Sequence, residues 1–201
     1  MLNLRPAVGR VVGPLAARLL RLGITPDMVT IAGAIGAVAA SLGLVARGHF
    51  FWGGVAVTLA VLTDALDGTM ARLRGPAGNW GAFLDSTLDR IADASVFSAL
   101  ALWYAGDGDS TVLLSVSLFC LVAGVVTSYA KARAEGLGMT CNVGLAERTE
   151  RLILVLAGII LAGIGVGFAL PVLLWVLAAA SAITVAQRLA EVHRQATVAA
   201  S

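Results

Sequence analysis

Long uncharged segments alternate with short charged ones along this chain. The uncharged runs cover residues 28–46, 48–63, 94–106, 110–130 and 152–187. The last run is too long for one membrane helix of about 20 residues, and its cluster of glycines around residue 165 predicts a turn inside it. In lipid, a helix satisfies its own backbone hydrogen bonds, which excludes an open sheet. The pattern therefore predicts an all-α integral membrane protein with six transmembrane helices.

The N-terminal segment has a different pattern. Its apolar residues recur at helical spacing and form one stripe, from which the arginines are absent. The stripe consists of Val8, Val11, Val12, Leu15, Leu19 and Leu22. This spacing predicts an amphipathic helix on the membrane surface. We expect one domain over residues 1–201, with the surface helix in 1–24 and the six-helix bundle in 25–194.

Composition agrees with a lipid environment. The chain is 59% hydrophobic and only 13% charged, whereas soluble domains carry about 25% charged residues. The net charge of +2 gives no reason to expect a nucleic-acid partner. The two cysteines predict neither a disulfide framework nor a zinc cluster.

Basic residues are unevenly distributed between the predicted loops. Six spans place both termini on one side, and of the lysines and arginines only Arg47 falls on the other side. The positive-inside rule then places both termini and the charged loops in the cytoplasm. We expect a multi-pass protein of the cytoplasmic membrane.

Five aspartates follow helical spacing around the second and third predicted spans. Asp64 and Asp67 lie three apart, and Asp85, Asp89 and Asp93 lie four apart, so each set shares a helix face. The short link at residues 73–80 predicts that the two helices are antiparallel neighbours. We expect the two sets to meet just inside the membrane.

Buried carboxylates near one another require a compensating positive charge. All the ligands are oxygens, which suits Mg²⁺, Mn²⁺ or Ca²⁺ rather than zinc. We expect Mg²⁺, with Mn²⁺ as an alternative. Four carboxylates can hold two ions, a common arrangement for phosphate chemistry. Ion pairs with Arg72, Arg74 and Arg90, or a proton relay, are the alternative.

The spacing of these aspartates also forms a longer motif. The run Asp64-x2-Asp67-Gly68-x2-Ala71-Arg72-x8-Gly81-x3-Asp85-x3-Asp89 resembles the signature of the CDP-alcohol phosphotransferases at all eight fixed positions. The resemblance implies six spans, a surface N-terminal helix and a homodimer. It also implies roles for the aspartates: Asp64, Asp67, Asp85 and Asp89 as metal ligands, and Asp89 as the general base. Asp93 lies outside the signature, and we expect it to support the site.

The resemblance extends to the lipid donor, CDP-diacylglycerol. It implies that Gly68 lets the nucleotide approach the backbone and that the segment opening the first span lies near the cytidine. As plain physics, that segment is a helix start with Pro26 in its first turn, and Asp27 stands where the family more often has asparagine. The candidate nucleotide-binding residues are Asp27, Met28, Val29, Thr30, Gly68, Arg72 and Gly78.

The region from residue 128 to 151 is unusually charged for this chain. Guanidinium and ammonium groups there suit a phosphorylated acceptor, and the candidates are Ser128, Lys131, Arg133, Arg148, Arg151 and Arg188. The alternative is cytoplasmic anchoring with local Glu–Arg pairs. The pattern resembles the bacterial phosphatidylinositol phosphate synthases within the family. This implies transfer of the phosphatidyl group to inositol 1-phosphate with release of CMP; glycerol 3-phosphate is the rival acceptor.

A different class of function would be a small ion transporter. Inverted repeats and a pathway of carboxylates would support it. The sequence contains no convincing repeat, and its carboxylates gather at one edge of the membrane. A purely structural membrane scaffold leaves the aspartate pattern unexplained.

Overall fold

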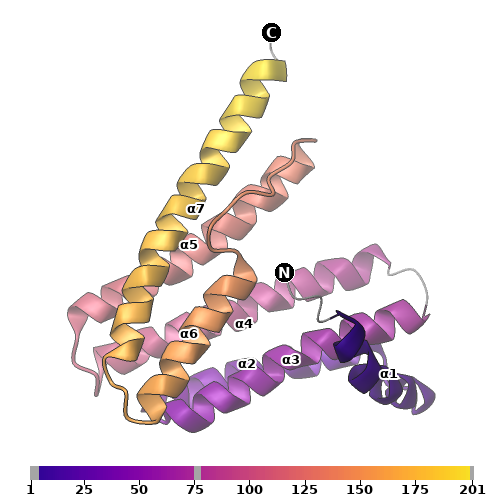
Figure 1. Cartoon of the computed structure of the whole chain (residues 1–201), viewed down its shortest axis with the longest axis horizontal. Coiled ribbons are helices and arrows are strands. Elements are labelled where there is room, and N and C mark those ends of the chain that lie inside the picture. The colour runs from indigo at the N-terminus through magenta and orange to yellow at the C-terminus, as the bar shows by residue number, and fades with distance from the viewer. Residues whose placement is uncertain (1–4, 75–77, 200–201) are drawn as a thin grey trace.

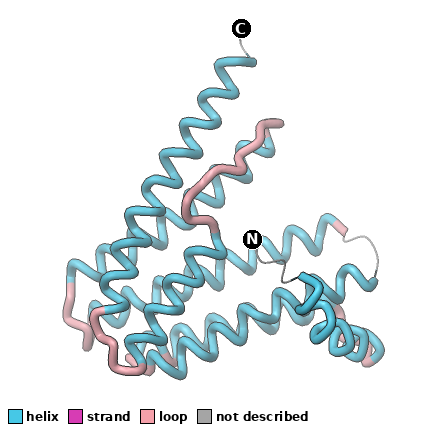
Figure 2. The backbone as a smooth tube through the Cα atoms, in the orientation of Figure 1, coloured by secondary structure: helices cyan, strands magenta, loops and turns pink. Residues whose placement is uncertain are grey.

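The structure is a computed structural model that describes residues 5–74 and 78–199, with side chains over 13–74 and 78–197. Within those residues all regular structure is helical (Figures 1 and 2), which confirms the all-α prediction. The elements are α1 (Arg5–Arg21), α2 (Pro26–Gly43), the 3₁₀ turn η1 (Val45–Arg47), α3 (Phe50–Arg74), α4 (Asn79–Ala105), α5 (Thr111–Gly136), α6 (Arg148–Gly163) and α7 (Ala169–Ala199).

Four helices in the described residues are long and apolar enough to cross a membrane. They are Pro26–Arg47, Phe50–Arg74, Thr111–Gly136 and Ala169–Thr197. The expected third and fifth spans do not reach that standard. The first half of α4 carries charged side chains, and α6 has only 16 residues, or about 24 Å of helix. The count of six spans therefore stays a prediction.

The helices form a chain of neighbours, with α2 packed against both α3 and α4 (Figure 1). Next, α4 packs on α5, α5 on α7, and α6 fills the space between α3 and α7. The expectation that α3 and α4 are direct antiparallel neighbours is wrong. Their backbones approach closely at few positions in the described residues, because both pack on α2. The acidic sets of the two helices are therefore joined by side chains that reach between them.

The predicted turn in the long apolar run is confirmed. α6 ends at Gly163 and α7 begins at Ala169, with Gly165 in the left-handed region at φ 98° between them. A side chain at Gly163 would overlap the backbone of Phe51 in α3. Close approach of backbones at small residues is a common way for membrane helices to associate, and here it fixes the hairpin against α3.

The N-terminal helix is confirmed as a helix, and it packs against α3. Ala16 is buried, whereas Leu15 and Leu22 of the predicted apolar stripe are largely exposed. The side chains of Val8, Val11 and Val12 in that stripe lie outside the described residues, as do residues 1–4 of the predicted surface segment. Its position on a membrane surface stays a prediction.

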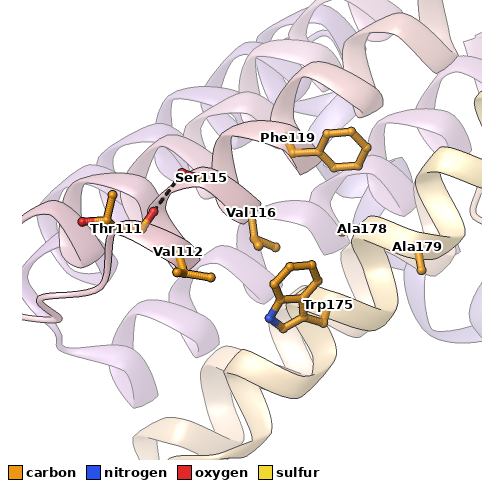
Figure 3. Close-up of a pocket in the computed structure, with 8 residues that line it drawn as sticks. All are labelled: Thr111, Val112, Ser115, Val116, Phe119, Trp175, Ala178 and Ala179. Atoms are coloured by element: carbon orange, nitrogen blue, oxygen red, sulfur yellow. Dashed lines mark hydrogen bonds between the residues drawn. The ribbon is translucent and has the colours of Figure 1, made fainter.

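An apolar groove of about 540 Å³ lies between the first half of α5 and α7. Figure 3 shows Phe119 and Trp175 on its two walls, with Val112 near its end. Its serine, Ser115, donates a hydrogen bond to the carbonyl oxygen of Thr111 at 2.8 Å, so that hydroxyl is already paired. Such a surface suits lipid chains between two long apolar helices.

Candidate active site

The signature aspartates line one cavity of about 430 Å³. Four elements supply its wall: the first turn of α2, the last turns of α3, the first half of α4 and the first residue of α6. The lining side chains and glycines are Pro26, Asp27, Thr30, Asp64, Asp67, Gly68, Ala71, Arg72, Gly81, Ala82, Asp85, Asp89 and Arg148. The motif residues of two helices thus meet in one space, as the sequence predicted.

The first turn of α2 is fixed in place by local hydrogen bonds. Thr25 is the N-cap, and its hydroxyl accepts from the backbone N–H of Met28 at 3.3 Å. Pro26 at the first helical position needs no such acceptor. This start orients Thr30, whose hydroxyl is 2.6 Å from Asp67 Oδ2. Asp67 is 5% exposed, and the hydroxyl satisfies one of its oxygens.

Arg148 joins the two acidic sets. Its Nη1 lies 3.0 Å from Asp64 Oδ2 on α3, and its Nη2 lies 2.7 Å from Asp89 Oδ1 on α4. Its Nε lies 3.3 Å from Asp93 Oδ1. A single guanidinium therefore bonds three carboxylates, which explains how α3 and α4 share a site although each packs on α2.

Asp93 is the centre of a second, deeper network. Its Oδ2 lies 3.3 Å from Arg151 Nη2 and 3.9 Å from Arg90 Nη1. Asp93 and Arg151 are 7% and 2% exposed. Two nitrogens there, Arg90 Nη1 and Arg151 Nε, are buried without a hydrogen-bond partner. Asp93 is therefore paired with three arginines, more than any other carboxylate in the described residues.

The loop before Arg148 is held by a polar stripe on α7. The Thr184 hydroxyl accepts from the N–H groups of Leu145 and Ala146 at 3.1 and 2.9 Å. Arg188 Nε donates to the Val143 carbonyl at 3.0 Å. Further along, the Gln195 amide bonds the Thr140 N–H and carbonyl at 3.0 and 2.7 Å. The stripe thus fixes the entry into α6, and with it the position of Arg148. Thr184 and Gln195 were not among the predicted site residues; the signal in the sequence was their helical spacing with Arg188, which places the three on one face of α7.

The six candidate acceptor residues do not form one cluster. Arg148 lines the aspartate cavity, and Arg151 reaches it only through Asp93. Arg188 is 4% exposed and donates to the Thr127 carbonyl at 2.6 Å, besides its bond to the loop. Three residues of α5, Ser128, Lys131 and Arg133, lie outside the lining of the aspartate cavity.

In the described residues, the side chains of these three α5 candidates either pair with a residue close along the chain or have no polar partner. The Ser128 hydroxyl donates to the Gly124 carbonyl at 3.0 Å, and Lys131 Nζ lies 4.0 Å from Glu135. The Arg133 side chain has no hydrogen bond or ion pair within the described part of the chain, and it is exposed. The pairing of Lys131 with Glu135 matches the anchoring alternative as well as the acceptor hypothesis.

The candidate nucleotide residues divide in a similar way. Four of them line the cavity: Asp27, Thr30, Gly68 and Arg72. Met28 is 55% exposed and, like Val29, is absent from that lining. Gly78 is the N-cap of α4 and is also absent from that lining, whose first residue on α4 is Gly81.

The ligand atoms that line the cavity suit a hard divalent cation. The cavity presents carboxylate oxygens and no sulfur or imidazole, which is the ligand set of Mg²⁺ or Mn²⁺. Within the described residues, however, no three acidic, histidine or cysteine side chains already stand in metal-binding proximity. Arg148 lies between Asp64 and Asp89 instead. A cation would have to draw the carboxylates together and away from that guanidinium.

Comparison with known proteins identifies the family. The sequence profile of the CDP-alcohol phosphatidyltransferases matches residues 23–195. The chain belongs to this family. That membership confirms an enzyme of phosphatidyl transfer, and it removes the support for an ion transporter or a scaffold.

Several phosphatidylinositol phosphate synthases are similar to this family member over most of their length. That of Streptomyces avermitilis is 48% identical over 197 residues, covering 94% of this chain and 81% of the relative. That of Mycobacteroides abscessus is 50% identical over 186 residues, covering 92% and 84%.

Solved structures of the Mycobacterium tuberculosis enzyme share the fold. The crystal structure with CDP-DAG bound has a TM-score of 0.88 at 46% identity and covers 91% of this chain and 94% of that one. The structure in complex with manganese and citrate has a TM-score of 0.85 at 45% identity, covering 90% and 88%. A metal-dependent reaction is therefore a property of the family to which this chain belongs.

Proposed function

We propose that the protein is a phosphatidylinositol phosphate synthase. It would transfer the phosphatidyl group of CDP-diacylglycerol to inositol 1-phosphate, giving phosphatidylinositol phosphate and CMP. The observation that carries the proposal is the single cavity in which Asp64, Asp67, Asp85 and Asp89 face Arg148. The names of the relatives and the CDP-DAG bound to the Mycobacterium tuberculosis enzyme support the choice of substrates.

In this proposal, Asp89 takes the proton of the acceptor hydroxyl. The resulting oxygen forms a bond to the phosphorus that carries the diacylglycerol, while the bond from that phosphorus to the CMP oxygen breaks and CMP leaves with the electron pair. A base must lie within hydrogen-bond reach of the hydroxyl, and Asp89 faces the cavity from the same wall as Asp85. The first turn of α2 and Arg72 would bind the CDP portion of the donor.

The four signature aspartates would hold Mg²⁺, with Mn²⁺ as a replacement. When bound, such ions stabilise the negative charge that develops on the diphosphate. In and behind the cavity, six carboxylates stand against four guanidiniums, which leaves two formal negative charges. One divalent ion balances that excess, and the diphosphate of the donor would balance a second.

The acceptor proposal depends on the arginines near α6. Arg148 is the one candidate already in the described wall of the cavity, and a guanidinium binds two phosphate oxygens at once. Arg188, Lys131 and Arg133 would extend the acceptor site away from the aspartates. Glycerol 3-phosphate remains the second candidate, because its phosphate would satisfy the same groups.

The proposal includes a setting in the membrane. We infer six spans, both termini and the cavity at the cytoplasmic face of the cell membrane, and a homodimer. The distribution of basic residues supports the orientation, and the apolar faces of α2, α3, α5 and α7 support insertion. Accessibility of single cysteines placed at His49 and at Gly138 to a membrane-impermeant reagent would test the orientation, since these positions lie on opposite sides.

The reaction is tested with purified protein in detergent or nanodiscs. CDP-diacylglycerol, Mg²⁺ and inositol 1-phosphate should give CMP and phosphatidylinositol phosphate. Equimolar glycerol 3-phosphate in the same assay decides the acceptor. Exclusive formation of phosphatidylglycerophosphate would reject the proposed acceptor, and no CMP release with either would reject the reaction.

A further inference from the structure

Arg148 occupies an unusual position for a cation. It is the first residue of α6, at the end where the helix dipole is positive, and a positive side chain there is unfavourable. The three carboxylates of Asp64, Asp89 and Asp93 offset that cost. Two of these carboxylates, Asp64 and Asp89, belong to the proposed metal site.

The three bonds of the guanidinium are not equivalent. The two terminal nitrogens hold Asp64 and Asp89, which line the cavity, whereas Nε holds Asp93, which does not line it. Asp93 is also fixed by Arg151. The Nε side of Arg148 is therefore anchored in the protein, while the terminal nitrogens face carboxylates that a cation would also require.

A divalent cation and the guanidinium cannot share these oxygens without cost. Two charges of the same sign that bind the same carboxylates repel each other more strongly in a partly buried cavity than in water, and a divalent ion doubles the charge on one side. The terminal nitrogens would then lack acceptors inside a cavity. A phosphate supplies two oxygens in the geometry that a guanidinium fork prefers.

We propose that Arg148 exchanges partners when a cation binds. In the metal-free protein its terminal nitrogens neutralise Asp64 and Asp89. Once a cation takes those carboxylates, the terminal nitrogens bind the acceptor phosphate, while Asp93 retains Nε. This inference rests on the proposed function for the identity of the phosphate. It makes Arg148 a residue that couples metal occupancy to acceptor binding, so that the acceptor binds well only after the metal.

The first test measures the affinity of metal-free, full-length protein for Mn²⁺ by calorimetry. Arg148→Gln should bind Mn²⁺ at least tenfold more tightly than the wild type, because the competing guanidinium is gone. Arg72→Gln is the matched control: it removes the same charge from the same cavity, but Arg72 bonds Thr69 and no carboxylate in the described residues. An equal gain in both variants would mean a through-space effect only and would overturn the proposal.

The second test measures the binding of inositol 1-phosphate and of inorganic phosphate, each with and without Mn²⁺. In the wild type, Mn²⁺ should raise the affinity for the phosphate by a factor within the usual 5–150-fold range of coupled sites. In Arg148→Gln the factor should fall at least several-fold, and in Arg148→Lys, which retains the charge without the fork, it should be intermediate. An unchanged factor in Arg148→Gln would overturn the proposal.

The two probes separate this inference from the proposed function. Coupling with inorganic phosphate but not with inositol 1-phosphate would reject the acceptor and support the exchange of Arg148. Thermal unfolding of each variant checks that it is folded. If Arg148→Gln does not fold, the comparison of Arg148→Lys with Arg72→Lys replaces it, and equal Mn²⁺ affinity and equal coupling in those two variants would overturn the exchange.

Discussion

Replacing Asp93 tests the deeper charge network directly. Asp93→Asn retains the size of the side chain and removes the only carboxylate that pairs with Arg151 in the described residues. Arg151 is 2% exposed, and its Nε already lacks a partner. Breaking a buried ion pair by removing one partner costs about 3–5 kcal/mol, because the remaining charge is buried without compensation.

That cost should appear in thermal unfolding of the metal-free protein in detergent. For a chain of 150–250 residues, about 1 kcal/mol shifts Tm by about 2–4 °C, so we expect Asp93→Asn to lower Tm by about 6–20 °C. Asp85→Asn is the control on the same helix. Asp85 is exposed and has no ion pair in the described part of the chain, so its replacement should change stability by no more than about 0.5 kcal/mol.

A double variant distinguishes the ion pair from simple packing. Asp93→Asn combined with Arg151→Met removes both charges and should recover much of the lost stability, because a buried pair can be replaced by apolar residues at little cost. A Tm loss for Asp93→Asn no greater than that of Asp85→Asn would refute the reasoning. So would a double variant less stable than Asp93→Asn alone.

Four further substitutions test the proposed active site. Asp89→Asn should lower kcat by about 10²–10⁴-fold, the usual contribution of a general base, with binding of CDP-diacylglycerol largely retained. Thr30→Val removes the hydroxyl 2.6 Å from Asp67 and should weaken Mn²⁺ binding by about tenfold, a typical loss when a supporting contact to a ligand is removed. Lys131→Ala should raise KM for the acceptor several-fold and leave KM for the lipid donor unchanged. Arg188→Ala should raise the acceptor KM and also lower Tm, because Arg188 bonds two backbone carbonyls.

Each of these substitutions has a measurement that can contradict it. Unchanged turnover in Asp89→Asn excludes that residue as the base, and Asp89→Glu serves as the charge-retaining control. For Thr30, calorimetric titration with Mn²⁺ is compared with Thr30→Ser, which keeps the hydroxyl. Equal changes in both KM values for Lys131→Ala would exclude it from the acceptor site, and an unaltered Tm in Arg188→Ala would contradict its role in fixing the loop.

The sequence predicted the site because helical spacing fixes which residues share a face. Asp64 and Asp67, and likewise Asp85 and Asp89, had to point in common directions once the helices formed, and all four line one cavity. The turn between α6 and α7 was predicted for a similar local reason, since glycines in an apolar run interrupt a helix. Both predictions concern residues that are close along the chain.

The failures concern contacts between distant segments. Spacing along α3 and α4 says nothing about a third helix that packs against both, so the position of α2 could not be foreseen. Arginine side chains are long and flexible, and their partners depend on what lies within reach in three dimensions. For that reason Arg148, Arg151 and Arg188 were recognised as a charged group, but the carboxylates and carbonyls that they bind were not.

The polar stripe on α7 that holds the loop at residues 137–147 has a consequence for how this sequence can change over evolutionary time. On the loop side, all the atoms held by Thr184 and Gln195 belong to the main chain, and so does the carbonyl held by Arg188. Any amino acid other than proline supplies the same groups. These hydrogen bonds therefore place a requirement on three side chains of the helix and on no side chain of the loop, where packing restricts the buried Cys141 and Ala146 and the close approach of Gly144 to Thr184. In related enzymes we expect hydrogen-bonding side chains to be retained at the three helix positions, and the exposed positions of the loop that precedes Arg148 to vary.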